Sequence, residues 1–221
     1  MFNRLAIAAA LALGAVAHAH ADTVSFTGFQ TGSVAIAAAG PVSTTADAGE
    51  FKGLADGRSF LSYCIELTQQ IPAWNSPDAS YTRHAIGADN RFDAASIGRL
   101  DRLYTHFLSD SRASAINSAA FQLAVWEIVY DSDATLNLKA GDFRLGTNSG
   151  ASALAAIDRA GFYLTGLDQR AASGVSFEVL QSASRQDQLV ARVPAPGTLA
   201  LALGGGAIAW IGARRAARRA A

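Results

Sequence analysis

The period of the hydrophobic pattern changes twice along the chain, and this change limits the fold more than any other feature. From residue 22 to about residue 68, apolar and polar residues alternate in short runs separated by Gly, Pro, Ser, Thr and Asp, as in strands. Between residues 94 and 164, apolar residues recur every three or four positions, as on one face of a helix. The expected helices are 94–108, 114–130 and 151–164, and the expected closing strands are 175–180 and 189–193. This order predicts an α+β domain in which an inserted helical subdomain packs against the strands of a β-barrel or sandwich.

Local signals refine this outline at three places. Asp56-Gly57 is a common two-residue connection between antiparallel strands, so it predicts a turn. The segment 71–81 is rich in Pro, Asn and Ser and is expected to be a loop. Ser111 and Ser114 are both candidates to cap the second helix, because a serine hydroxyl accepts hydrogen bonds from the free N–H groups of a first turn.

The N-terminal segment indicates export. Arg4 precedes an apolar run of about a dozen residues, which is the length of the hydrophobic region of a secretory signal and too short to span a bilayer. Ala19 and Ala21 supply the small residues that a signal peptidase requires, so cleavage is expected before Asp22. We therefore interpret residues 1–21 as a signal peptide, and a retained anchor is the alternative.

The C-terminal segment indicates sorting at a membrane. Residues 193–213 carry no charge and are long enough to cross a bilayer, and an arginine-rich tail that begins with Arg214 and Arg215 follows them. With Pro194 and Pro196 in front, this arrangement resembles the PEP-CTERM sorting signal of Gram-negative bacteria, although Ala195 stands where that family usually has glutamate. The resemblance implies a precursor anchored in the inner membrane, processing by an exosortase-type enzyme, and a final place at the cell surface or outside the cell. An ordinary tail anchor is the alternative.

The charge of the segment between these two signals restricts its partners. All 18 acidic residues lie within 22–192, together with only 13 of the 18 basic residues, so this segment is net acidic. A nucleic-acid partner would require a basic face and is not expected. The sequence also contains no metal-ligand cluster and no phosphate-binding loop, and we expect no cofactor.

Cys64 is the only cysteine of the chain. In an oxidising compartment it has no second cysteine with which to form an intramolecular disulfide. The alternation around it places Cys64 on the same strand face as Ser62, Glu66 and Thr68, so we expect the sulfur on the polar side of the strand. A lone thiol in that position suggests that the sulfur has a chemical function.

A second motif lies on the second expected helix, where Gln122, Ala124 and Trp126 form the pattern Gln-x-Ala-x-Trp. Together with the upstream Tyr63-Cys64-Ile65-Glu66, this pattern resembles the thioester domains of bacterial surface adhesins, although Phe121 stands where that family often has threonine. The resemblance implies a bond between the Cys64 sulfur and the Gln122 side chain. It also implies covalent adhesion, by a single reaction with an amine or hydroxyl of a surface or matrix partner and without enzymatic turnover.

Neighbouring side chains are candidate helpers of this bond. Glu66 lies two residues from Cys64 on the same expected face, where it would act as a base or be held protonated, since its anion would raise the pKa of the thiol. Trp126 lies four residues from Gln122 on the same helix face and is expected either to shield the bond or to belong to the core. Glu127 points about 140° away and is expected to be structural or solvated.

Two other functions are compatible with the residues. The first is a non-covalent structural protein of the extracellular matrix or biofilm, in which Cys64 is inert. The second is a cysteine hydrolase or transglutaminase-like enzyme that uses His84 or His106. Such an enzyme needs an oriented histidine and an oxyanion site, and no sequence signature supplies them.

Overall fold

Six antiparallel strands close into a barrel in the order β1-β4-β5-β9-β8-β6. In the computed structural model, the described residues are 20–40, 42–88, 91–131 and 135–192. The barrel strands are β1 (His20–Phe29), β4 (Phe51–Ala55), β5 (Arg58–Cys64), β6 (Asp78–Ala85), β8 (Ser176–Gln181) and β9 (Gln188–Arg192). The expected turn at Asp56-Gly57 is confirmed, since both residues have positive φ, as a two-residue turn between β4 and β5 requires.

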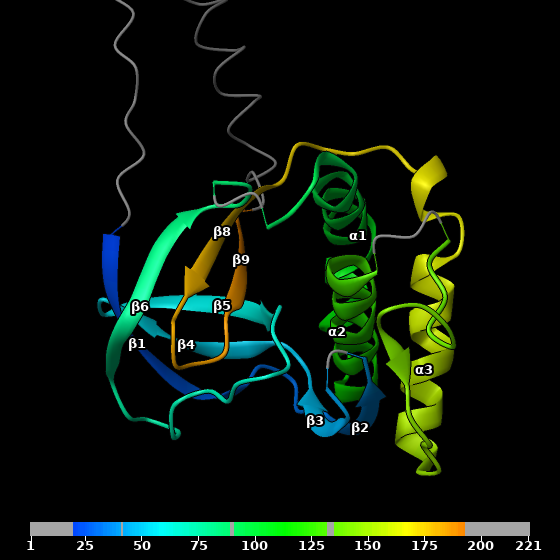
Figure 1. The fold of residues 1–221 in the computed structure, drawn as a ribbon, viewed down its shortest axis with the longest axis horizontal. Coiled ribbons are helices and arrows are strands. Elements are labelled where there is room, and N and C mark those ends of the chain that lie inside the picture. Colours follow the sequence, from blue (N-terminus) through cyan, green and yellow to red (C-terminus); the bar gives the residue numbers. More distant parts are fainter. Residues whose placement is uncertain (1–19, 41, 89–90, 132–134, 193–221) are drawn as a thin grey trace, which may run out of the picture.

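Three helices form a second layer beside the barrel, as expected. They are α1 (Ala94–Ser111), α2 (Ala115–Tyr130) and α3 (Ala151–Leu164), and the short 3₁₀ helix η1 (Leu167–Gln169) follows them. Asp93 caps α1 and Ser114 caps α2 through their side-chain oxygens. Figure 1 shows α1 and α2 between the barrel and α3. The α+β expectation with an inserted helical block is therefore confirmed, because the helices lie in the chain between the paired strands β6 and β8.

The helix α2 lies at the centre of the molecule. It is apolar on every side, and all residues from Ser118 to Ile128 are buried. It packs on α1, on α3 and on strand β5, and it also contacts a small sheet of three strands. That sheet has the order β3-β2-β7, formed by β2 (Val34–Ala39), β3 (Thr44–Ala48) and β7 (Arg144–Leu145).

The expectation of a loop over 71–81 is wrong at its end, where β6 begins at Asp78. Of the residues of β6, only Tyr81 is buried, so the strand lacks the apolar alternation by which strands are recognised. Its position is fixed instead by pairing with β1 and β8, and by Arg83, which forms ion pairs with Asp22 and Glu178.

The terminal signals lie almost wholly outside the described residues. Residues 1–19 and the whole segment 193–221 are outside the described part of the chain. Because β1 begins at His20, cleavage before Asp22 would remove the first two residues of that strand. Within 20–192, apart from the gaps, no helix has the length and apolar character needed to cross a membrane.

Candidate functional site

The side-chain oxygen and nitrogen of Gln122 both form hydrogen bonds with the main chain of Cys64. The Cys64 N–H donates to Gln122 Oε1 at 2.9 Å, and Gln122 Nε2 donates to the Cys64 carbonyl oxygen at 2.7 Å. Both residues are almost completely buried. The two residues that the sequence analysis selected therefore meet in the fold, 58 positions apart in the chain.

This contact lies beside the first residue of strand β4. β4 pairs with β5 only as far as Ser62, whereas on the opposite edge of β5 the strand β9 pairs with Tyr63 and Cys64. At Cys64 the peptide groups on the β4 side therefore lack a strand partner. The carboxamide of Gln122, presented by α2, takes that place in the hydrogen-bonding ladder.

The polar side of the strand, on which Cys64 was expected, is covered by other elements. The Cys64 side chain is only 1% exposed, and Ser62 on the same strand and Glu66, which follows the end of β5, are also buried. The face is polar but covered: the Ser62 hydroxyl donates to Gln188 Oε1 at 2.9 Å. Alternation along a strand shows which residues share a face, and it does not show whether another element covers that face.

The environment of the sulfur keeps it protonated. Burial is the main cause that raises the pKa of the Cys64 thiol to about 12, and the negative charges of Glu66 and Asp187 act in the same direction. The thiol donates to the Glu66 carbonyl oxygen at 2.7 Å, and the Glu66 N–H donates back to the sulfur at 3.4 Å. At neutral pH the resting group is a thiol.

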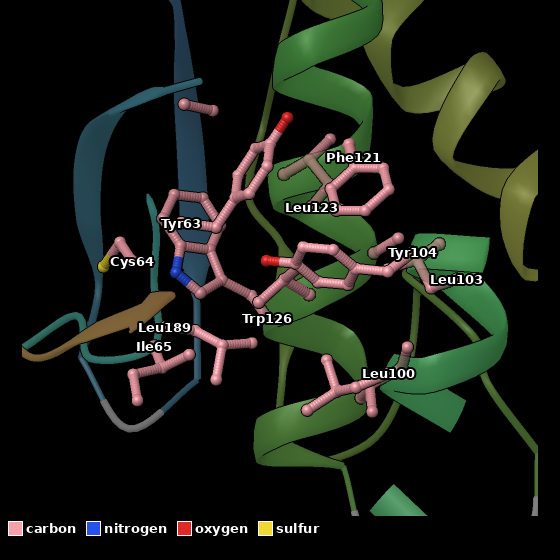
Figure 2. Packing of buried hydrophobic residues seen from close by; sticks show 14 of the residues in the cluster. Tyr63, Cys64, Ile65, Leu100, Leu103, Tyr104, Phe121, Leu123, Trp126 and Leu189 are labelled. Carbon is pink, nitrogen blue, oxygen red and sulfur yellow. The ribbon is translucent and has the colours of Figure 1, made fainter. Parts of the chain in front are cut away.

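Trp126 places a second donor near the sulfur. Figure 2 shows the indole nitrogen turned toward the strand that carries Cys64. The indole N–H lowers the pKa of the thiol, yet it makes no hydrogen bond of normal geometry with the described residues. A buried N–H without a regular hydrogen bond costs free energy. This N–H can therefore donate to an acceptor atom placed beside it.

The carboxylate of Glu66 forms hydrogen bonds within the turn that follows β5. It accepts hydrogen bonds from the N–H and the hydroxyl of Thr68, and from the N–H of Gln69 at 3.1 Å. Glu66 contacts the sulfur through its main chain instead. Its geometry therefore offers no side-chain base at Cys64.

A pocket of about 380 Å³ reaches Cys64 and Trp126 from the surface. We call it the Cys64 pocket. Aromatic, hydroxyl and amide side chains line most of it. Its lining residues are Phe29, Thr44, Thr45, Ala46, Asp47, Phe51, Cys64, Leu67, Thr68, Gln69, Gln70, Ile71, Pro72, Ala73, Trp74, Trp126 and Gln186. Its volume lies at the small end of the range for ligand pockets.

The other titratable candidates do not belong to this pocket. His84 contacts Gln181 Oε1 and the carbonyl oxygen of Ala85, and His106 contacts the carbonyl oxygen of Ala171. Glu127 is fully buried and accepts a hydrogen bond from the Asn137 N–H, so its structural interpretation is confirmed and a solvated position is wrong. Burial raises the pKa of Glu127 to about 7.

Sequence reasoning missed one member of the site. The Tyr130 hydroxyl accepts a hydrogen bond at 2.8 Å from the N–H of Leu67, in the segment that follows β5. Gln122, Trp126 and Tyr130 are spaced four residues apart on α2 and so form one stripe that faces the end of β5. This spacing is visible in the sequence and would have identified Tyr130.

Comparisons with protein-family models, with curated proteins and with solved structures found no match to this chain. Within the described part of the chain, no group of three or more His, Cys, Asp or Glu side chains is arranged to hold a metal ion.

Proposed function

We propose that this protein is exported and forms an intramolecular thioester between Cys64 and Gln122, which it uses once to attach covalently to an amine or hydroxyl of a surface or matrix partner. The observation that carries the proposal is the reciprocal pair of hydrogen bonds between the Gln122 carboxamide and the Cys64 main chain. It fixes the electrophilic carbon beside the residue that bears the only thiol.

The bond would form by attack of the Cys64 sulfur on the Gln122 side-chain carbon. Negative charge then develops on Oε1, which already accepts the Cys64 N–H, so a donor is in place before the reaction begins. The thiol proton moves to Nε2, the carbon–nitrogen bond breaks, and ammonia leaves. Because the thiol is protonated at rest, the reaction depends on the fixed position of the two groups rather than on a preformed thiolate.

The second step would consume the bond. An amine attacks the acyl carbon, the carbon–sulfur bond breaks, and a proton returns to the sulfur, which leaves an amide and a free thiol. Because Cys64 is only 1% exposed, little of the bond would face the water of the pocket before a partner enters it. The protein is changed by the reaction and is not an enzyme.

Export and sorting form the other part of the proposal, and sequence alone supports them. Signal peptidase would remove residues 1–21, and an exosortase-type enzyme would process the precursor near Pro194 and Pro196. Deletion of 198–221 should abolish surface display, measured by antibody labelling of intact cells. Unchanged display would contradict this part.

The intact mass of the processed protein tests the thioester. The chain should be lighter by one ammonia than its sequence requires, and Cys64→Ala and Gln122→Ala should each have the full mass of their sequence. The thiol should resist alkylation in denaturant until an amine has been added. A full mass, together with a Cys64 that alkylates at once, would contradict the proposal.

A non-covalent structural role in the matrix or biofilm is the second candidate. The buried thiol, with its raised pKa and its hydrogen bond to Glu66, favours this candidate, because these are features of an inert core cysteine. The same mass measurement separates the two functions.

A further inference from the structure

The outer wall of the Cys64 pocket is a fixed aromatic surface. Trp74 is 45% exposed and packs edge-on against Phe29 at 5.5 Å and tilted against Phe51 at 6.1 Å between ring centroids. The N–H of Asn75 donates to the carbonyl oxygen of Phe26 at 2.7 Å and anchors the loop to β1. An exposed indole held in this way offers a flat apolar face on the wall of a pocket that also includes Cys64, the residue whose main chain holds the Gln122 carboxamide.

The remaining polar side chains of the pocket are almost all uncharged. They are Thr44, Thr45, Thr68, Gln69, Gln70 and Gln186, and Asp47 at the rim is the one charged residue of the lining. Two buried polar atoms there have no hydrogen bond of normal geometry with the described residues: the acceptor Gln69 Oε1, and the donor Trp126 Nε1, which interacts with the Cys64 thiol. Neutral donors and acceptors beside an aromatic face suit a ring with several hydroxyl groups and an apolar C–H face.

The pocket offers few groups that can act as a base, and this selects the nucleophile: the carboxylate among its described lining residues is that of the exposed Asp47. No histidine of the described residues lines the pocket, and a hydroxyl attacks an acyl group slowly unless a base removes its proton. A neutral amine needs no such base. An amine beside the oxygens of a sugar ring is less basic than lysine, whose pKa is about 10.4, so more of it is neutral at pH 7.

We propose, on the basis of the thioester function above, that the Cys64 pocket binds an amino sugar whose ring stacks on Trp74 and whose free amine accepts the Gln122 acyl group. The amine nitrogen bonds to the side-chain carbon of Gln122, the carbon–sulfur bond breaks, and the displaced proton goes to the Cys64 sulfur. The partner is then a polysaccharide that carries unacetylated hexosamine units.

The test compares amines on the processed protein whose ammonia-deficient mass has been measured. Glucosamine, methylamine and Nα-acetyl-lysine are incubated separately at equal concentrations of neutral amine, and adducts are followed by intact mass. We expect glucosamine to react about tenfold faster than methylamine, with N-acetylglucosamine forming no adduct but slowing the reaction of glucosamine.

Two variants locate the effect. Trp74→Ala should lower the rate with glucosamine about tenfold and leave the rate with methylamine unchanged. Phe162→Ala is the matched control, because Phe162 is an aromatic residue of similar exposure that lies on α3, outside the pocket. In this variant the rates with glucosamine and with methylamine should both stay unchanged.

The outcomes separate this proposal from the thioester itself. Equal rates for all amines, or an equal loss for all amines in Trp74→Ala, would overturn the sugar site and leave the thioester, with a protein lysine as the partner. A protein with no ammonia deficit would refute the thioester and with it the acyl transfer. Binding of a glucosamine oligomer, measured by tryptophan fluorescence, then tests the ring site alone, and equal binding by the wild type and Trp74→Ala would overturn that as well.

Discussion

The burial of the Cys64 sulfur makes the stability of the protein depend on pH in the range where the thiol ionises. In an unfolded chain a thiol ionises near its ordinary pKa of 9.0, whereas burial raises the pKa in the folded protein to about 12. Between these values the unfolded state has lost the proton that the folded state still holds. The thiol therefore contributes stability that is complete below about pH 9 and declines as the pH rises toward 12.

We predict that a variant with a free Cys64 loses stability above pH 9 more steeply than one without the thiol. Gln122→Ala cannot form the bond and keeps a free thiol. Its free energy of unfolding should fall faster with pH than that of the double variant Cys64→Ala/Gln122→Ala, by up to about 1.4 kcal/mol per pH unit. Buried tyrosines, whose pKa values are also raised by burial, contribute equally to both variants. Urea unfolding between pH 8 and pH 11 measures the difference, and parallel curves would show that the thiol is not held in a desolvated site.

At the scale of the elements, a few buried hydrogen bonds fix the position of α2 relative to the strands. Besides the pair at Cys64, the hydroxyl of Ser118 accepts the N–H of Glu50 at 2.7 Å, in the turn between β3 and β4. Both residues are buried, so no water can replace the hydroxyl if it is removed.

We predict that Ser118→Ala lowers the free energy of unfolding by about 1–3 kcal/mol, because the N–H of Glu50 would be buried without an acceptor. Ser109→Ala, at an exposed position of α1, is the control and should change it by less than about 0.5 kcal/mol. Urea denaturation of the two variants and the wild type measures this. Equal values for both variants would mean that the turn finds another acceptor.

The elements differ in how far the sequence predicts them. Apolar residues at intervals of three and four predict the three helices, but they do not predict that α2 is buried on every side. The two-residue turn follows from Asp56-Gly57. Strand β6 could not be recognised, because pairing with β1 and β8 fixes it and its own residues do not alternate. The contact of Cys64 with Gln122 was expected from a family resemblance, since no local pattern reports which strand meets which helix.

At the scale of the whole molecule, the contact between Cys64 and Gln122 joins the barrel to the helical layer. β5 belongs to the barrel, and α2 is the central helix of the other layer, on which α1 and α3 pack. Both layers share one hydrophobic core, so they are expected to unfold together. A covalent bond at this point would cross-link the two layers and close a loop of 58 residues.

Such a cross-link should stabilise the protein, because it restricts the unfolded chain. For a loop of this length the chain-entropy model gives about 4 kcal/mol, which corresponds to roughly 10 °C in Tm for a domain of this size. We predict that methylamine, which opens the bond, lowers the Tm of the wild type by about that amount and leaves Cys64→Ala unchanged. Calorimetry of both proteins before and after treatment, with intact mass as the record of opening, measures the effect. If the opened wild type keeps its original Tm while its mass shows complete reaction, the bond serves attachment alone and does not hold the barrel to α2.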